Sequence, residues 1–202
     1  MIRKRPSRQR GAVAVEFAIV LPLLALLVFG AVEMGSAWND SQTVLTSSRT
    51  AARSLAQFGD APEADRDALL SIEAAFANTN VTVAAVIIYE SDDAVNAGGA
   101  PTACVAAAEA GVTYAGGENC NVYPTAEFTT AVGPTGAASF GCTGTDLDSN
   151  WCPTSRTRNQ ATATFIGVEV FGTRTSVTGV DDIPVPTALD QFSVMRMEPF
   201  PT

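Results

Sequence analysis

The sequence has 202 residues, enough for one domain of modest size, and a formal net charge of −9 at pH 7. Its first eleven residues hold five of the twelve basic residues and no acid, so the rest of the chain carries seven basic residues against twenty-one acids. Phosphate binding needs clustered Lys and Arg, and this balance therefore argues against nucleic acid as a partner. Histidine is absent and the only lysine is Lys4, which excludes Ser-His-Asp, Cys-His and Ser-Lys catalysis in the rest of the chain. We expect no enzyme activity, no cofactor and no small-molecule substrate.

The apolar segment after the basic region predicts a transmembrane helix over residues 12–38. It contains only two ionisable residues, Glu16 and Glu33. A helix rises about 1.5 Å per residue, so about twenty residues cross a hydrocarbon core of roughly 30 Å. The basic residues 1–11 predict a cytoplasmic leader, which places residues 39–202 outside the cytoplasm as an exported domain. A removable signal peptide has a shorter apolar core of about 7–15 residues, so we favour a retained single-pass anchor, with Glu33 solvated near its outer end.

The helical pattern continues beyond the anchor. Apolar residues recur at helical spacing over residues 41–58, which predicts an amphipathic helix that continues the membrane span and packs against the domain. Gly59 is the expected stop. Pro22 is an expected kink inside the anchor, because proline has no N–H to donate. A second helix is predicted after Pro62, and acids near its start suit the positive end of a helix: Glu63, Asp65 and Asp67.

Three later segments predict strands because they are short and rich in β-branched residues or alternate in polarity. They are residues 81–89, 161–171 and 191–197. Residues 91–160, dense in Gly, Ala, Thr, Asn and Pro, predict a loop region that holds all four cysteines. Helices followed by a small antiparallel sheet define an α+β fold class.

The four cysteines lie in the part expected outside the cytoplasm, where an even number predicts two disulfides. Of the three possible connectivities we favour the pairs of sequence neighbours, Cys104–Cys120 and Cys142–Cys152, because each closes a short Gly-rich loop. A metal site is the alternative interpretation, but the spacings are not CxxC and no histidine is available.

One acidic motif imitates the start of a calcium loop. Asp146, Asp148 and Asn150 have the spacing of the first calcium ligands. Trp151 stands where such a loop needs glycine, and Thr157 where it needs a bidentate Glu. We therefore interpret this motif as a solvated turn and expect no metal.

The start of the anchor, RQRGAVAVEFAIVLPLLALLVFG, places a carboxylate inside an apolar helix. A charged side chain at the centre of a bilayer costs about 2.5–3.5 kcal/mol on insertion scales, so Glu16 is a functional candidate. Cleavage after Gly11 would make Ala12 a new N-terminus, whose ammonium group is then buried in membrane or filament. Glu16 of a neighbouring copy would replace two isolated buried charges by one ion pair. The alternative is an uncleaved chain in which Glu16 lies near the cytoplasmic headgroups.

Gly11, then Glu16–Phe17, then the run Leu21–Pro22–Leu23–Leu24 resemble the TadE-like pseudopilins of the tight-adherence pilus system, a type IV pilus-like assembly. Residues 8–38 carry most of this resemblance. The stretch SSRTAARSLAQFGD is similar to the helix that follows the anchor in that family, and VMRMEPF is similar to its closing strand.

The resemblance implies cleavage by a prepilin peptidase between Gly11 and Ala12, and assembly through Glu16, Phe17 and Pro22. Its implied partners are the membrane, other pilins or pseudopilins, and the pilus assembly machine. The implied function is that of a minor pilin in a pilus used for cell adhesion. Residues 91–160 have no counterpart that we assign to the family.

Two other functions remain open. The chain could be an uncleaved, single-span membrane-anchored adhesin or binding protein that uses residues 91–160 as its binding surface. A third hypothesis is a small secreted enzyme released from the membrane. The N-terminal residue of the mature protein separates the first two, because a pilin begins at Ala12 and a simple anchor keeps its leader.

Overall fold

The computed structural model describes residues 8–91, 98–159, 162–179 and 185–199, with side chains described from residue 13. Within these ranges a very long helix is joined to a domain that contains a four-stranded antiparallel sheet. The helices are α1 (Arg8–Phe58), α2 (Ala64–Phe76), α3 (Thr102–Glu109) and α4 (Thr125–Val132), with short 3-10 turns η1 (Gly136–Ser139) and η2 (Pro153–Ser155). The strands are β1 (Val81–Ser91), β2 (Cys120–Pro124), β3 (Phe165–Arg174) and β4 (Ala188–Arg196).

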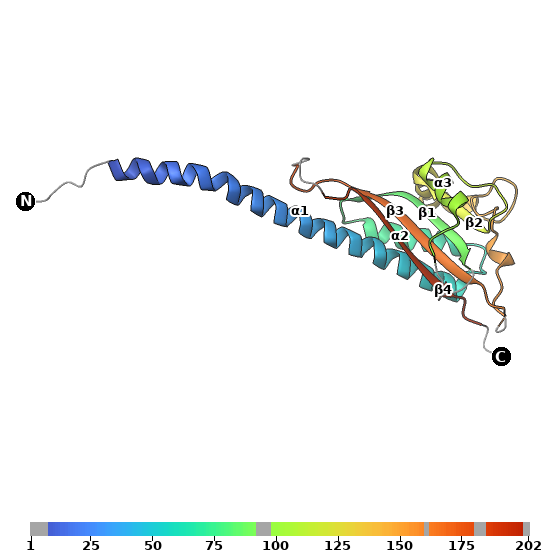
Figure 1. Ribbon diagram of the computed structural model, residues 1–202. Coiled ribbons are helices and arrows are strands. Elements are labelled where there is room, and N and C mark those ends of the chain that lie inside the picture. Colours follow the sequence, from blue (N-terminus) through green and yellow to red (C-terminus); the bar gives the residue numbers. More distant parts are fainter. Residues whose placement is uncertain (1–7, 92–97, 160–161, 180–184, 200–202) are drawn as a thin grey trace, which may run out of the picture.

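Helix α1 joins the predicted anchor and the predicted amphipathic helix into one element of 51 residues. It passes through Pro22 without a break, and its N-terminal half projects from the domain (Figure 1). It also begins at Arg8, so the last residues of the predicted leader are helical. It ends as expected before Gly59, where a Cβ atom would collide with the carbonyl oxygen of Leu55.

The sheet has the order β2-β1-β3-β4, and each neighbouring pair is antiparallel. One face packs against α1 and α2. The other face packs against α3. Because β1 lies between two strands and is covered on both faces, its middle residues Val86–Tyr89 are all buried, which explains why this strand reads as a continuous apolar run.

The stripe on the C-terminal half of α1 forms part of the main core, as predicted. Its buried members include Val44, Ala51, Ala52 and Leu55. Phe58, assigned to the same stripe by its spacing, is 63% exposed. It is the last residue of α1, and it lies on the solvent side of the turn to α2.

The prediction of a loop region over residues 91–160 was incomplete. This region contains α3, β2 and α4. Strand β2 has only five residues, and α3 has eight. Elements this short carry too few periods to be recognised from their pattern, and the Cys104–Cys120 disulfide holds these two together.

Candidate functional site

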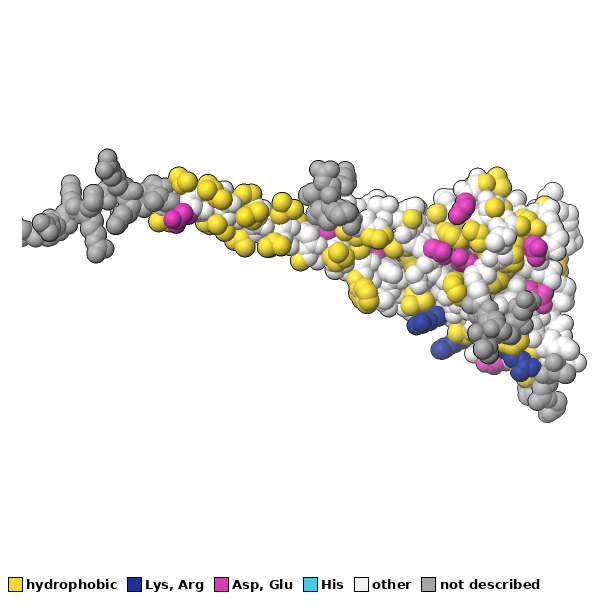
Figure 2. Space-filling view, in the orientation of Figure 1, with side chains coloured by type: hydrophobic (Ala, Val, Ile, Leu, Met, Phe, Trp, Pro, Cys, Tyr) yellow, Lys and Arg dark blue, Asp and Glu magenta, His cyan; other side chains and the backbone are white. Residues whose placement is uncertain are grey.

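The free part of α1 is the first candidate site. Its large apolar side chains from Val13 to Val32 are exposed around the helix, and Figure 2 shows them as an almost continuous hydrophobic surface. It is a helix long and apolar enough to cross a membrane. A stretch of twenty residues is about 30 Å long, which matches the hydrocarbon core. We conclude that this half of α1 is a single-pass membrane anchor.

The predicted assembly residues lie on this free part. Glu16 and Pro22 are exposed, and Phe17 is 60% exposed. The predicted processing site, Gly11 and Ala12, lies in the first turns of α1. No contact within the described chain brings these residues together with the domain, so any role for them involves lipid or another molecule.

The second candidate site is the junction where the anchor meets the domain. Glu33, expected to be solvated, is only 2% exposed. Arg174, the last residue of β3, donates from Nη2 to Glu33 Oε1 at 2.7 Å. The loop after β3 donates to Glu33 Oε2 through the backbone N–H groups of Val177 and Thr178, at 3.1 and 3.2 Å, and through the hydroxyls of Ser176 and Thr178, at 3.2 and 3.1 Å. The solvated interpretation of Glu33 was therefore wrong.

A second carboxylate on α1 shares the same arginine. Asp40 lies two turns after Glu33 and accepts a hydrogen bond from Arg174 Nε at 3.1 Å. Ser36, between them on the helix, accepts from Arg174 Nη2 at 2.9 Å. One guanidinium thus holds three positions along α1, which fixes both the height and the rotation of the domain on the anchor. We call Glu33, Asp40 and Arg174 the junction triad.

Sequence reasoning missed the junction triad because its members are far apart in the chain. Glu33 and Arg174 are 141 residues apart. The available signal was the spacing of Glu33 and Asp40 by seven residues, which puts both on one helix face. The sequence does not show which cation that face meets.

A second buried ion pair lies inside the domain. Asp65 was expected to serve only the positive end of α2, but it is fully buried and paired with Arg156 at 2.6 and 2.9 Å. The Arg156 guanidinium also lies 4.1 Å from the centroid of the Trp151 ring. Asn121 and Tyr123 of β2 each donate to Asp65 Oδ2 at 2.8 Å. Burial, together with the neighbouring Asp65 carboxylate, raises the pKa of the Tyr123 hydroxyl well above its usual value, which keeps it a donor. This network ties α2, β2 and the cysteine-containing region into one unit.

Both predicted disulfides are present. Cys104–Cys120 joins α3 to β2, and Cys142–Cys152 closes the loop before η2. The acids of the calcium-like motif act as hydrogen-bond acceptors in this loop. Asp146 accepts from the backbone and hydroxyl of Thr143, and Asp148 accepts from the backbone of Cys142.

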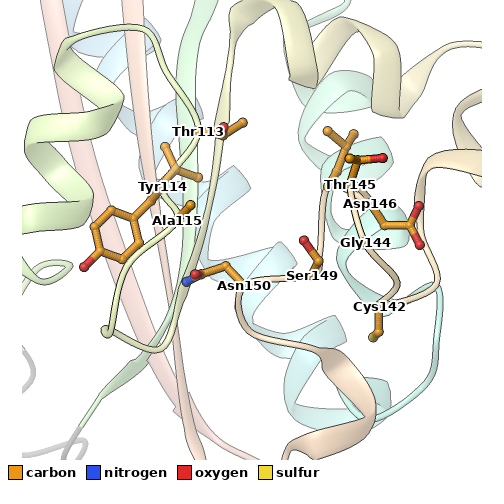
Figure 3. Close-up of a pocket in the computed structure, with 11 residues that line it drawn as sticks. Thr113, Tyr114, Ala115, Cys142, Gly144, Thr145, Asp146, Ser149 and Asn150 are labelled. Atoms are coloured by element: carbon orange, nitrogen blue, oxygen red, sulfur yellow. The ribbon is translucent and has the colours of Figure 1, made fainter.

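A cavity of about 500 Å³ opens beside this loop. Figure 3 shows Tyr114 and Asp146 on its two sides, pointing away from each other. Asn150, between them, donates to the backbone oxygens of Glu118 and Cys120. The side chains of Asp146 and Asn150 are therefore used within the fold. Among the described residues, no group of three or more His, Cys, Asp or Glu side chains is placed to hold a metal.

A family model described as TadE-like protein matches residues 11–53. The TadE-like resemblance is thereby confirmed for this segment. The match begins at the predicted processing glycine, includes Glu16, Glu33 and Asp40, and ends at Arg53 on the packed half of α1. The TadE-like family is a structural family of the tight-adherence pilus, and the match covers 43 of the 202 residues, all of them in α1. Comparison with curated proteins and with solved structures gave no significant match.

Proposed function

We propose that this chain is a minor pilin, or pseudopilin, of a tight-adherence pilus. It would assemble through the free half of α1 and present the sheet domain outside the cytoplasm. The observation that carries the proposal is an apolar helical surface, exposed on all sides, with one carboxylate near its inner end. A simple anchor has no need of Glu16, whereas an assembling helix uses it to neutralise the N-terminal amine of a neighbour.

Processing after Gly11 supplies that amine. The scissile bond lies near the start of α1, where the first N–H groups have no partner within the helix and the turn frays easily. Glycine further weakens a helix, by about 1 kcal/mol relative to alanine. Local opening at Gly11 would therefore let a prepilin peptidase bind the bond in an extended form.

The alternative function is an uncleaved membrane-anchored adhesin. The observation in its favour is that α1 is already helical from Arg8. Mass spectrometry of the N-terminal peptide from membranes decides between the two functions. We expect Ala12 as the first residue, and a mature protein that retains residues 1–11 would exclude the pilin.

Glu16→Ala tests the role of the carboxylate itself. We expect this variant to be cleaved normally but to be recovered in sheared pili at least tenfold less than the wild type. Glu118→Ala, a change of an exposed carboxylate in the domain, is the matched control and should assemble normally. Wild-type recovery of the Glu16 variant would remove the proposed ion pair.

A further inference from the structure

Two pairs of like charges face solvent on the two helices of the domain. Arg49 and Arg53 lie one turn apart on the exposed side of α1. Figure 2 shows basic side chains along the edge of the domain that α1 forms. Glu63 and Asp67 lie one turn apart on the exposed side of α2. None of the four has an ion-pair partner among the described residues.

Each pair is unfavourable in the isolated chain, because like charges four residues apart on a helix repel each other. Three of the other basic residues of the domain are used within the fold, since Arg156, Arg158 and Arg174 form ion pairs. Glu63 is the N-cap residue of α2, yet its side chain makes no capping hydrogen bond. Both charged pairs are therefore available to a partner.

The two pairs lie within about 9 Å of each other in height above the membrane. The connection between α1 and α2 is only five residues, 59–63, so α2 turns back along α1 and shares its core. The last turns of α1 and the first turn of α2 are consequently at the same end of this helical hairpin. Counted from that end, Arg53 and Arg49 lie five and nine residues down α1, whereas Glu63 lies at the end itself and Asp67 three residues down α2. At about 1.5 Å per residue, the arginine pair is on average about 9 Å nearer the membrane than the acidic pair, and Arg53 is within about 3 Å of the height of Asp67.

Lipid headgroups do not explain the arginine pair. Arg49 lies sixteen residues beyond Glu33, or about 24 Å along an upright helix. The headgroup layer extends only about 5–8 Å beyond the hydrocarbon core. The arginines are therefore too far from the bilayer for a headgroup to neutralise them.

We propose that Arg49 and Arg53 of one copy dock on Glu63 and Asp67 of a second copy of this chain. Copies anchored in one membrane, or released from it into one filament, stand parallel, so the two patches of neighbouring copies overlap in height at Arg53 and Asp67. The long arginine side chains, or an axial offset of about 9 Å between copies, bring the remaining pair together. The patches lie on two different helices, so the contact is heterologous and each copy can bind one neighbour on each side. Such a contact repeats into a ring or a helical array. The inference rests on the proposed pilin function and names one of its subunit contacts.

Cysteine cross-linking in intact membranes tests this contact. Thr46→Cys, exposed one turn before the arginine pair, and Leu70→Cys, one turn after Asp67, are placed in two differently tagged copies. All four native cysteines are in disulfides, so mild oxidation reports only the new pair. We expect a mixed dimer. Thr46→Cys with Ala75→Cys, exposed about 140° around α2 from Leu70, should give at least fivefold less.

Reversing the charges of the two pairs tests whether their attraction holds the copies together. Arg49→Glu with Arg53→Glu in the first copy should lower the mixed dimer at least fivefold. Adding Glu63→Arg with Asp67→Arg in the second copy should restore it to within twofold of the original. About 1 M salt, where the screening length is about 3 Å, should lower the yield of the original pair.

The docking contact would be overturned if Thr46→Cys and Leu70→Cys gave no mixed dimer, or if charge reversal left the yield of that dimer unchanged. The same membranes are checked for an N-terminal Ala12 and for the Glu16→Ala assembly defect. If these are found without the dimer, the docking surface is wrong and the pilin function stands. If the leader is retained and the dimer still forms, the pilin function is wrong and the contact belongs to an anchored oligomer.

Discussion

The two halves of α1 belong to one helix but are built for different surroundings. From Val13 to Val32 the large apolar side chains are between 47% and 71% exposed and surround the helix. Beyond Asp40, apolar burial is confined to one stripe, and much of it comes from the small residues Ala51 and Ala52. A helix that is apolar on every side needs lipid or neighbouring helices, whereas a one-sided stripe needs only its own domain.

The change from one half to the other occurs at the junction triad. Glu33 and Asp40 are the first buried side chains on α1, and both are acidic. The domain thus contacts α1 through ion pairs next to the anchor, and through apolar side chains on the turns beyond Asp40. These ion pairs fix the rotation and the height of the domain on α1, which the small apolar residues farther along the helix would define less well.

Of the changes considered, loss of the junction triad should lower the free energy of unfolding most. Arg174→Leu leaves Glu33 and Asp40 without their cation, and removing one partner of a buried ion pair costs about 3–5 kcal/mol. We expect a loss of this size in the free energy of unfolding of the full chain in detergent, measured with urea.

Arg53→Leu is the control, because Arg53 is exposed on the same helix and should change stability by no more than about 0.5 kcal/mol. Equal unfolding midpoints for Arg174→Leu and the wild type would show that the triad does not hold the domain to the helix.

A matched pair of leucine substitutions compares the two halves directly. Leu55 is fully buried in the domain core, whereas Leu24 is 51% exposed on the anchor. Leu55→Ala should cost about 2–5 kcal/mol because it removes buried methyl groups and leaves a cavity. Leu24→Ala should leave domain unfolding in detergent unchanged. A comparable loss from both would mean that the anchor half packs on the domain, contrary to the structure.

The sequence was a good guide where a pattern repeats within one segment. The amphipathic half of α1, strand β1 and the two disulfides were all predicted, since helical spacing, β-branched runs and cysteine order are local signals. Strand β2 and helix α3 were missed, because five and eight residues are too few for periodicity.

Buried polar pairs were missed for a different reason. Asp65 and Arg156 are 91 residues apart, and Asp65 lies at a helix start, where an exposed acid is also favourable. Charge pairing across such distances depends on how the sheet places its strand ends. The family match covers the anchor and the arginine pair of α1 but ends before α2. It therefore gives no information on the ion pair between Asp65 and Arg156.

The smallest predicted effect concerns the sheet face that packs on α3. Burial raises the pKa of Glu169 on β3 to about 7, although the backbone N–H of Ala100 donates to it, and the neighbouring carboxyl of Asp190 on β4 raises it further. The folded chain therefore binds more protons than the unfolded chain between pH about 4.5 and about 7. The stability supplied by this proton is complete below pH about 4.5 and is lost as the pH rises through about 7.

We expect the free energy of unfolding of the full chain in detergent to be about 1–2 kcal/mol lower at pH 8 than at pH 5 because of Glu169. The change is no larger because Asp190 is exposed, and solvent screens its repulsion of the Glu169 carboxylate. Glu169→Gln keeps an acceptor for Ala100 and removes the titration, so it should flatten the pH profile and stabilise the protein at pH 8. Glu118→Gln, an exposed control, should keep the wild-type slope. An unchanged slope in the Glu169 variant would mean that the proton is held elsewhere, and the α3 face would then contribute to stability through its apolar contacts and the Cys104–Cys120 disulfide alone.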